Sequence, residues 1–120
     1  MQKDELPPRI KKAMRSLVGL AREVEFRRAL EEVHADFQHW KAGGIDSFEL
    51  SDHIHKFHDG PNREIYLRYT SRLDPRFLIR YALEEKLIHE ADVSEEIRPY
   101  LDQSPSSAAY PTSLNRETGE

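Results

Sequence analysis

Apolar residues recur at intervals of three and four over the first third of the chain, which is the period of an α-helix. They form two series, Ile10, Met14, Leu17, Ala21 and Val24, followed by Phe26, Leu30, Val33, Phe37 and Trp40. The two series are out of phase, because residues 24 and 30 are six apart where a heptad rhythm requires about seven. We therefore predict one helix over residues 8–42 that bends or changes its contact face near residues 24–26.

The length of this helix constrains its packing. At about 1.5 Å per residue it extends roughly 50 Å, which exceeds what a compact domain of this size needs. We expect part of it to pack against another chain, and a two-fold homodimer is the simplest solution because one surface then satisfies itself. The residues predicted at this interface are Leu17, Val24, Val33, Phe37 and Trp40.

Capping signals place the next helix. The glycine pair at residues 43–44 predicts the end of the long helix, with one glycine in the left-handed conformation. Asp46 predicts a new helix start with Glu49 as its reciprocal capping partner, and Ile45 with Leu50 supplies an apolar clamp across the turn. The helix should cover residues 47–58 and bury Phe48 or Leu50, together with Ile54 and Phe57.

The remainder of the chain also has a helical pattern. Gly60 and Pro61 predict a break and the start of a helix over residues 61–72. Asp74 followed by Pro75 predicts a capped helix that continues to about residue 90, and a last short turn ends near residue 101. No segment alternates between polar and apolar residues as a strand does.

These patterns predict an all-α fold, a bundle of four to five helices with one long N-terminal helix, short helices after it and a disordered C-terminal tail. A chain of 120 residues has the size of one ordinary domain. We predict a single helical domain over residues 1–102. Residues 103–120 are polar, contain proline and lack any period, so we predict a flexible polar tail there.

Composition excludes several classes of site. The chain has no cysteine, which rules out disulfides, thiolate zinc sites and thiol nucleophiles in it. No apolar run approaches the roughly 20 residues of a membrane span, and the first residues lack the hydrophobic centre of a secretory signal. We therefore expect a soluble, cytoplasmic protein with no membrane partner.

The stretch SDHIHKFHDG, residues 51–60, concentrates ligand-type side chains. Residues three and four apart share a helix face, so Asp52, His55 and either His58 or Asp59 should line one side. These are ligand types that a divalent metal accepts, with Glu64 or His34 to complete the site. The alternative is that they form solvated surface pairs, because their spacing matches no closed ligand motif.

Arg28 and His34 form a second candidate site. Their spacing resembles the Arg and His pair of the HEPN ribonucleases, which are all-helical and of similar length. The resemblance covers these two positions, and Ala29 stands where that family usually has a polar residue. It implies a catalytic role for the pair. In the alternative interpretation, Arg28 forms surface ion pairs and His34 flanks the apolar series.

A run of arginines interleaved with tyrosines is the third candidate, as a site for single-stranded RNA. The arginines are Arg63, Arg68, Arg72, Arg76 and Arg80. Residues 63–83 carry a net charge of +3 and residues 84–102 carry −5, so these blocks could instead pair with each other within or between subunits. The whole chain has a net charge of −4, whereas nucleic-acid binders of this size are more often basic.

We interpret the sequence as a non-catalytic helical protein that acts by protein–protein association, as a homo-oligomer or as a small subunit of a larger assembly. The first alternative is a metal- or histidine-dependent hydrolase or nuclease centred on Asp52, His55 and His58. The second is an RNA-binding accessory protein. The interpretation requires no cofactor, although a divalent metal stays open under the first alternative.

Overall fold

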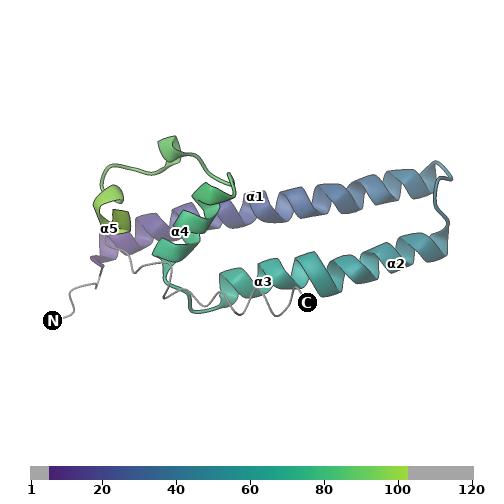
Figure 1. Cartoon of the computed structure of the whole chain (residues 1–120), viewed down its shortest axis with the longest axis horizontal. Helices are drawn as coiled ribbons and strands as arrows, with labels where there is room; N and C mark the ends of the chain where they lie inside the picture. Colours follow the sequence, from purple (N-terminus) through teal and green to yellow (C-terminus); the bar gives the residue numbers. More distant parts are fainter. Residues whose placement is uncertain (1–5, 103–120) are drawn as a thin grey trace. The chain divides into compact units, whose positions relative to one another are not determined.

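A computed structural model describes residues 6–102, and these residues are all-α with no strand among them, as predicted. The predicted tail at residues 103–120 lies outside the described residues. In chain order the elements are α1 (Pro8–Lys41), α2 (Ser47–Phe57), the π-helical turn η1 (His58–Asn62), α3 (Arg63–Thr70), α4 (Pro75–Glu84), the 3-10 turn η2 (Glu90–Asp92) and α5 (Arg98–Asp102) (Figure 1).

The described residues divide into two compact units that share α1. The terminal unit contains residues 6–18 and 74–102, and the hairpin unit contains residues 19–73. The single domain predicted over residues 1–102 remains a prediction. Each unit is described below by its own packing.

The predicted long helix is confirmed, and its end has the predicted glycine signal. Gly43 has φ 85°, and the backbone N–H of Gly44 donates to the carbonyl of His39 at 2.7 Å. The N–H of Gly43 donates to the carbonyl of Trp40 at 3.0 Å. This pair of bonds is a Schellman motif, which satisfies carbonyls that the helix end leaves free.

The predicted capping box at the start of α2 is also confirmed. The N–H of Glu49 donates to the Asp46 carboxylate at 2.8 Å, and the N–H of Asp46 donates to the Glu49 carboxylate at 2.9 Å. Leu50 is buried and Ile45 is half-buried, consistent with the predicted apolar clamp. Between Phe48 and Leu50 the structure therefore buries Leu50, at 6% exposure, whereas Phe48 is 82% exposed.

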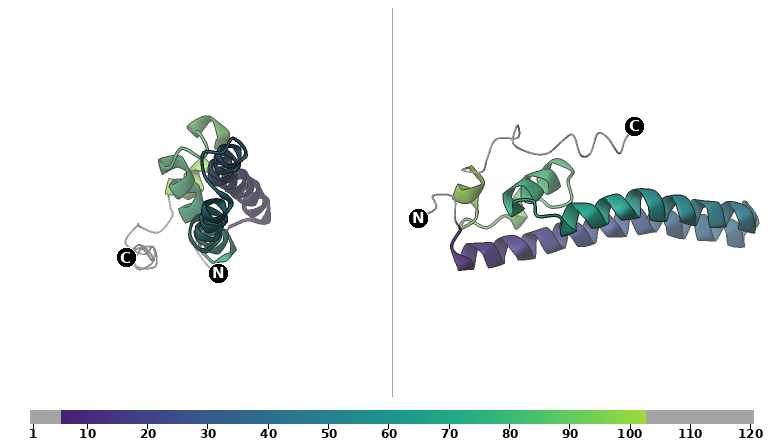
Figure 2. Two further views of the ribbon diagram at one scale, coloured as in Figure 1. Left: turned by 90° about the vertical axis from the view of Figure 1, so that its right-hand side faces the viewer. Right: turned by 90° about the horizontal axis from the view of Figure 1, so that it is seen from below.

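The break predicted at Gly60 and Pro61 is wrong. The chain stays helical from α2 through η1 into α3, as the continuous ribbon of Figures 1 and 2 shows. Pro61 has no N–H and its ring would clash with a carbonyl one α-helical turn earlier. A π-helical turn holds one extra residue, which separates those groups and lets the helix continue.

The start of α4 agrees with the prediction, but its end does not. The Asp74 carboxylate accepts from the N–H of Arg76 at 2.9 Å, and Pro75 follows the cap. The helix ends at Glu84 rather than near residue 90, because Lys86 has φ 59° and the N–H of Leu87 donates to the Ala82 carbonyl at 2.8 Å. This turn delivers Leu87 into the core of the terminal unit.

The terminal unit has a well-filled apolar core. Eleven of the fourteen buried apolar residues in the described part of the chain belong to it. They are Leu6, Ile10, Met14, Leu17, Leu78, Ile79, Ala82, Leu87, Ile88, Val93 and Ile97. Ile10, Met14 and Leu17 of the first apolar series therefore belong to this core, whereas Ala21 and Val24 of the same series lie in the hairpin unit.

Candidate functional site

Contacts along the whole length of the hairpin unit join its two arms. In this unit α2, η1 and α3 run antiparallel to the second part of α1 (Figures 1 and 2). Near the tip, Trp40 Nε1 donates to Ser47 Oγ at 3.0 Å, and His53 Nδ1 lies 3.3 Å from the Asp36 carboxylate.

At the other end of the hairpin, one α1 carboxylate holds two α3 side chains. Arg68 donates to Glu25 Oε2 at 2.6 Å, and the Tyr69 hydroxyl donates to Glu25 Oε1 at 2.8 Å. Polar contacts thus fix the register of the two arms from one end to the other.

The hairpin unit buries few apolar side chains. Among the described residues of this unit, only Ala21, Leu50 and Ile65 are buried and apolar. All eight large apolar residues that are exposed in the described part of the chain also lie in this unit. They are Leu20, Leu30, Phe37, Trp40, Phe48, Ile54, Tyr66 and Leu67, which we call the exposed apolar set. Ile54 was predicted to be buried, and its 39% exposure corrects that prediction.

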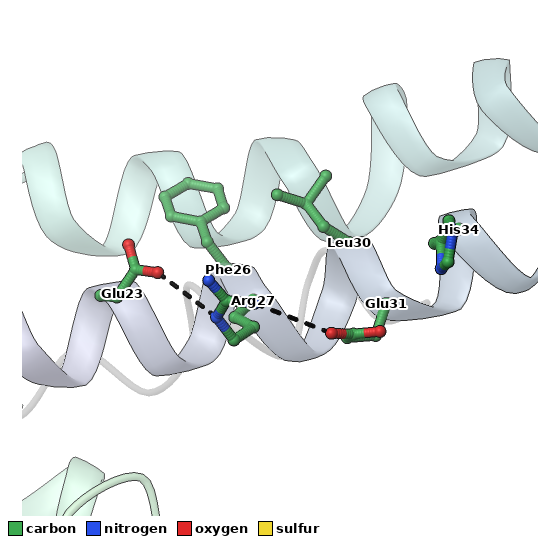
Figure 3. A pocket seen from close by; sticks show the side chains of 6 residues that line it. All are labelled: Glu23, Phe26, Arg27, Leu30, Glu31 and His34. Atoms are coloured by element: carbon green, nitrogen blue, oxygen red, sulfur yellow. Dashed lines mark ion pairs between the residues drawn. The ribbon is translucent and has the colours of Figure 1, made fainter.

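A shallow hollow of about 260 Å³ lies along one face of α1 (Figure 3). It is lined by Glu23, Phe26, Arg27, Leu30, Glu31 and His34. Figure 3 shows Phe26 and Leu30 on one side of the hollow, and Arg27 between two carboxylates at 3.6 and 3.8 Å. Apolar side chains next to charged ones are typical of a protein contact surface.

A second hollow of about 230 Å³ lies where α1 meets α2 and η1. It shares no lining residue with the first hollow. It is lined by Ala29, Glu32, Val33, Asp36, His53, Lys56, Phe57 and Pro61. Because two helices flank this groove without closing over it, Val33 and Phe57 remain only half-buried.

The five residues predicted at an interface differ in exposure. Phe37 and Trp40 are exposed and make an edge-to-face pair with ring centroids 6.3 Å apart. Val24 and Val33 are half-buried. Leu17 is buried in the terminal unit, so it supports the fold of that unit and contributes no exposed surface.

The predicted histidine face divides into two separate pairs. His55 Nε2 lies 3.2 Å from the Asp59 carboxylate, and Lys56 Nζ lies 3.1 Å from the Asp52 carboxylate. His58 is exposed at the start of η1. Within residues 6–102, no three histidine or acidic side chains converge closely enough to hold a metal ion.

Arg28 and His34 are both exposed on α1. His34 lines the hollow of Figure 3, whereas Arg28 is not among the lining residues. Six residues correspond to about 240° around a helix, so the two side chains leave α1 in different directions. The structure therefore does not bring this pair to one site.

Among the five candidate RNA-binding arginines, Arg76 and Arg68 make close ion pairs within the chain. Arg76 is 4% exposed and its guanidinium contacts the Asp74 carboxylate at 2.5 Å. Arg68 pairs with Glu25, and both side chains are largely buried. Arg63 and Arg72 are exposed in the hairpin unit, and Arg80 lines a hollow of the terminal unit.

Most of the exposed apolar set was absent from the sequence-based candidates, which contained only Phe37 and Trp40. The omitted residues are Leu20, Leu30, Phe48, Ile54, Tyr66 and Leu67. The available signal was an excess of apolar positions over what a two-helix hairpin can bury, since each helix has only one neighbour there.

No protein-family model, curated protein or solved structure matches this chain in comparisons with known proteins. None of the helices within residues 6–102 is both long enough and apolar enough to cross a membrane. The exposed apolar set is consequently the feature from which a function can be argued.

Proposed function

We propose that the protein acts by protein–protein association through the exposed apolar set of its hairpin unit. The supporting observation is the contrast within one chain, because one unit buries eleven apolar residues and the other buries three while exposing eight. Exposed apolar patches on folded domains commonly mark sites of association. We retain the sequence-based expectation of a cytoplasmic location.

The composition of the set suits a protein interface. It contains Trp40, Phe37, Phe48 and Tyr66, and aromatic residues of this kind are enriched in the energetic centres of interfaces. The half-buried Phe26, Val33 and Phe57 lie beside it and would be covered further by a partner. Charged residues such as Arg27 and Glu31 line the margin of the first hollow and could orient that partner.

Site-specific photo-cross-linking in cells that express the protein natively tests this proposal. A photoreactive residue at position 48 or 67 should form covalent adducts with protein, and mass spectrometry should identify the partner. The same residue at position 15, which is exposed in the terminal unit, is the matched control. Adducts at position 15 alone, or at none of the three positions, would count against the proposal.

A further inference from the structure

The hairpin unit has an uneven distribution of charge along its length. The contacts of Asp36 with His53 and of Glu25 with Arg68 show which residues face each other across it. They place residues 30 and 60 at about the same level, near its midpoint. We call residues 31–59 the tip half, and residues 19–30 with 60–73 the base half.

The two halves carry opposite net charges. The tip half contains seven carboxylates and two lysines, a net charge of −5 with neutral histidines. The base half contains six arginines and three glutamates, a net charge of +3. An ion pair between two residues of the same half contributes zero to the net charge of that half, so these net values hold whether or not such pairs form. At about 1.5 Å per residue the centres of the halves lie roughly 17 Å apart, beyond the screening length of about 10 Å at 0.1 M salt.

The exposed apolar set is shared equally between the halves. Phe37, Trp40, Phe48 and Ile54 belong to the tip half, and Leu20, Leu30, Tyr66 and Leu67 belong to the base half. Exposed apolar residues therefore occur along the full length of the hairpin. A partner of similar length, with apolar residues at both ends and the reverse order of charge, would complement it.

We infer that this partner is a second copy of the same hairpin, packed antiparallel so that each tip half lies on the base half of the other copy. This inference rests on the proposed function, because it names the occupant of the same apolar surface. A two-fold axis perpendicular to the long axis of the hairpin reverses the order of charge in the second copy. In the antiparallel dimer a tip half of net charge −5 faces a base half of net charge +3 at two places. Two paired helical hairpins also form a four-helix arrangement that buries apolar residues of both. A parallel pair would instead oppose like charges at both ends.

Sedimentation of the full chain over a range of concentrations measures the dissociation constant of the dimer and shows whether salt raises or lowers it. For the antiparallel dimer this constant should rise about tenfold between 0.1 and 1 M NaCl, because the screening length falls from about 10 to about 3 Å and the attraction between opposite charges weakens. The variant R63E/R72E lowers the base half from +3 to −1 and should also weaken the dimer about tenfold or more at low salt.

The matched control is K12E/R15E, which changes the net charge by the same amount at exposed positions of the terminal unit. It should leave dimerisation within about twofold of the unmodified chain. Dimerisation that strengthens with salt or in R63E/R72E would indicate a parallel pair and overturn the inference. Equal weakening by both variants would do the same, because it would reflect overall charge.

Thiol cross-linking provides an independent measurement, since the chain contains no cysteine. Ser51 and Thr70 are exposed at positions roughly symmetric about the middle of the arm formed by α2, η1 and α3. A mixture of S51C and T70C chains should be joined by a short bis-maleimide, whereas neither variant alone should be joined to itself. Self-linking of S51C with no mixed product would overturn the antiparallel order.

A chain that stays monomeric at every concentration would exclude the second copy as partner. The proposed function would survive that outcome if position 48 or 67 formed adducts with a different protein in cells. It would fail with the inference if those positions formed no adduct. The two experiments together therefore separate failure of the partner assignment from failure of the association surface.

Discussion

Glu25 on α1 and Arg68 on α3 form an ion pair with a contact of 2.6 Å, although 43 residues separate them in sequence. Their side chains are 15% and 17% exposed, so the pair is largely shielded from water. The same carboxylate accepts from the Tyr69 hydroxyl. This cluster joins the two arms of the hairpin at the end far from the connecting loop.

A double-mutant cycle on Glu25→Gln and Arg68→Met should give a coupling energy of about 1–2 kcal/mol, because partly buried charged hydrogen bonds exceed exposed ones. Urea unfolding monitored by circular dichroism provides the free energies. The variant Tyr69→Phe is a control that removes one hydrogen bond and should cost about 1 kcal/mol. Coupling near zero would mean that the pair contributes nothing to holding α3 against α1.

The ion pair of Asp74 with Arg76 leads to a prediction of how the free energy of unfolding depends on pH. Hydrogen bonds from the Arg76 guanidinium lower the pKa of Asp74 below its ordinary value, with partial burial acting in the opposite direction. A lowered pKa in the folded state means that the stabilisation is complete above the ordinary pKa of about 3.9 and is lost as pH falls through the folded pKa. Asp74→Asn should cost about 1–3 kcal/mol near neutral pH and flatten this acid dependence.

Urea unfolding at several pH values between about 6 and about 2.5 measures this effect. Asn keeps an oxygen that can cap α4, so the variant isolates the charge from the cap. An acid profile that is unchanged in Asp74→Asn would assign the pH dependence to other carboxyl groups.

Lys86 ends α4 in a conformation that favours glycine. Its φ of 59° lies in the left-handed region, where a Cβ is unfavourable. Lys86→Gly should therefore raise the free energy of unfolding by about 0.5–1 kcal/mol. Lys86→Ala keeps the Cβ and removes the rest of the side chain, so it should give no gain. A gain of equal size in both variants would place the cause in the lysine side chain rather than in the backbone.

Substitutions at Phe48 and Leu50 distinguish an effect on association from an effect on folding. Leu50 is buried, and Leu50→Ala should cost about 2–5 kcal/mol. Phe48 is exposed, and Phe48→Ala should change the stability of the monomer by no more than about 0.5 kcal/mol while weakening association. Thermal melts at low concentration and sedimentation at high concentration measure the two effects. A large loss of monomer stability in Phe48→Ala would show that this side chain packs within the chain.

The fluorescence of Trp40, the only tryptophan in the chain, reports directly on the hairpin tip. Trp40 is 37% exposed, and an antiparallel second copy would cover it with the base half of its partner. The emission maximum should therefore shift to shorter wavelength as concentration rises, and R63E/R72E should suppress the shift. A maximum that stays constant while the chain dimerises would place the contact away from the tip.

Local features of this protein were determined by the sequence alone. The reciprocal cap of Asp46 and Glu49, a left-handed glycine at residues 43–44 and the Asp74 cap before Pro75 were all predicted and found. Each depends on groups within a few residues of one another, so the local sequence specifies it without reference to how distant parts of the chain pack.

Only the tertiary structure decided which apolar residues have a partner. The period of α1 identified both apolar series, but it could not show that Met14 would be buried and Leu30 exposed. Burial depends on the element that packs opposite, and the terminal unit supplies such elements where the hairpin has only two arms. The pairing of Glu25 with Arg68 was inaccessible for the same reason, since the antiparallel return of the chain sets their register. The continuous helix through Pro61 likewise required a π-helical turn, which a local rule for proline does not predict.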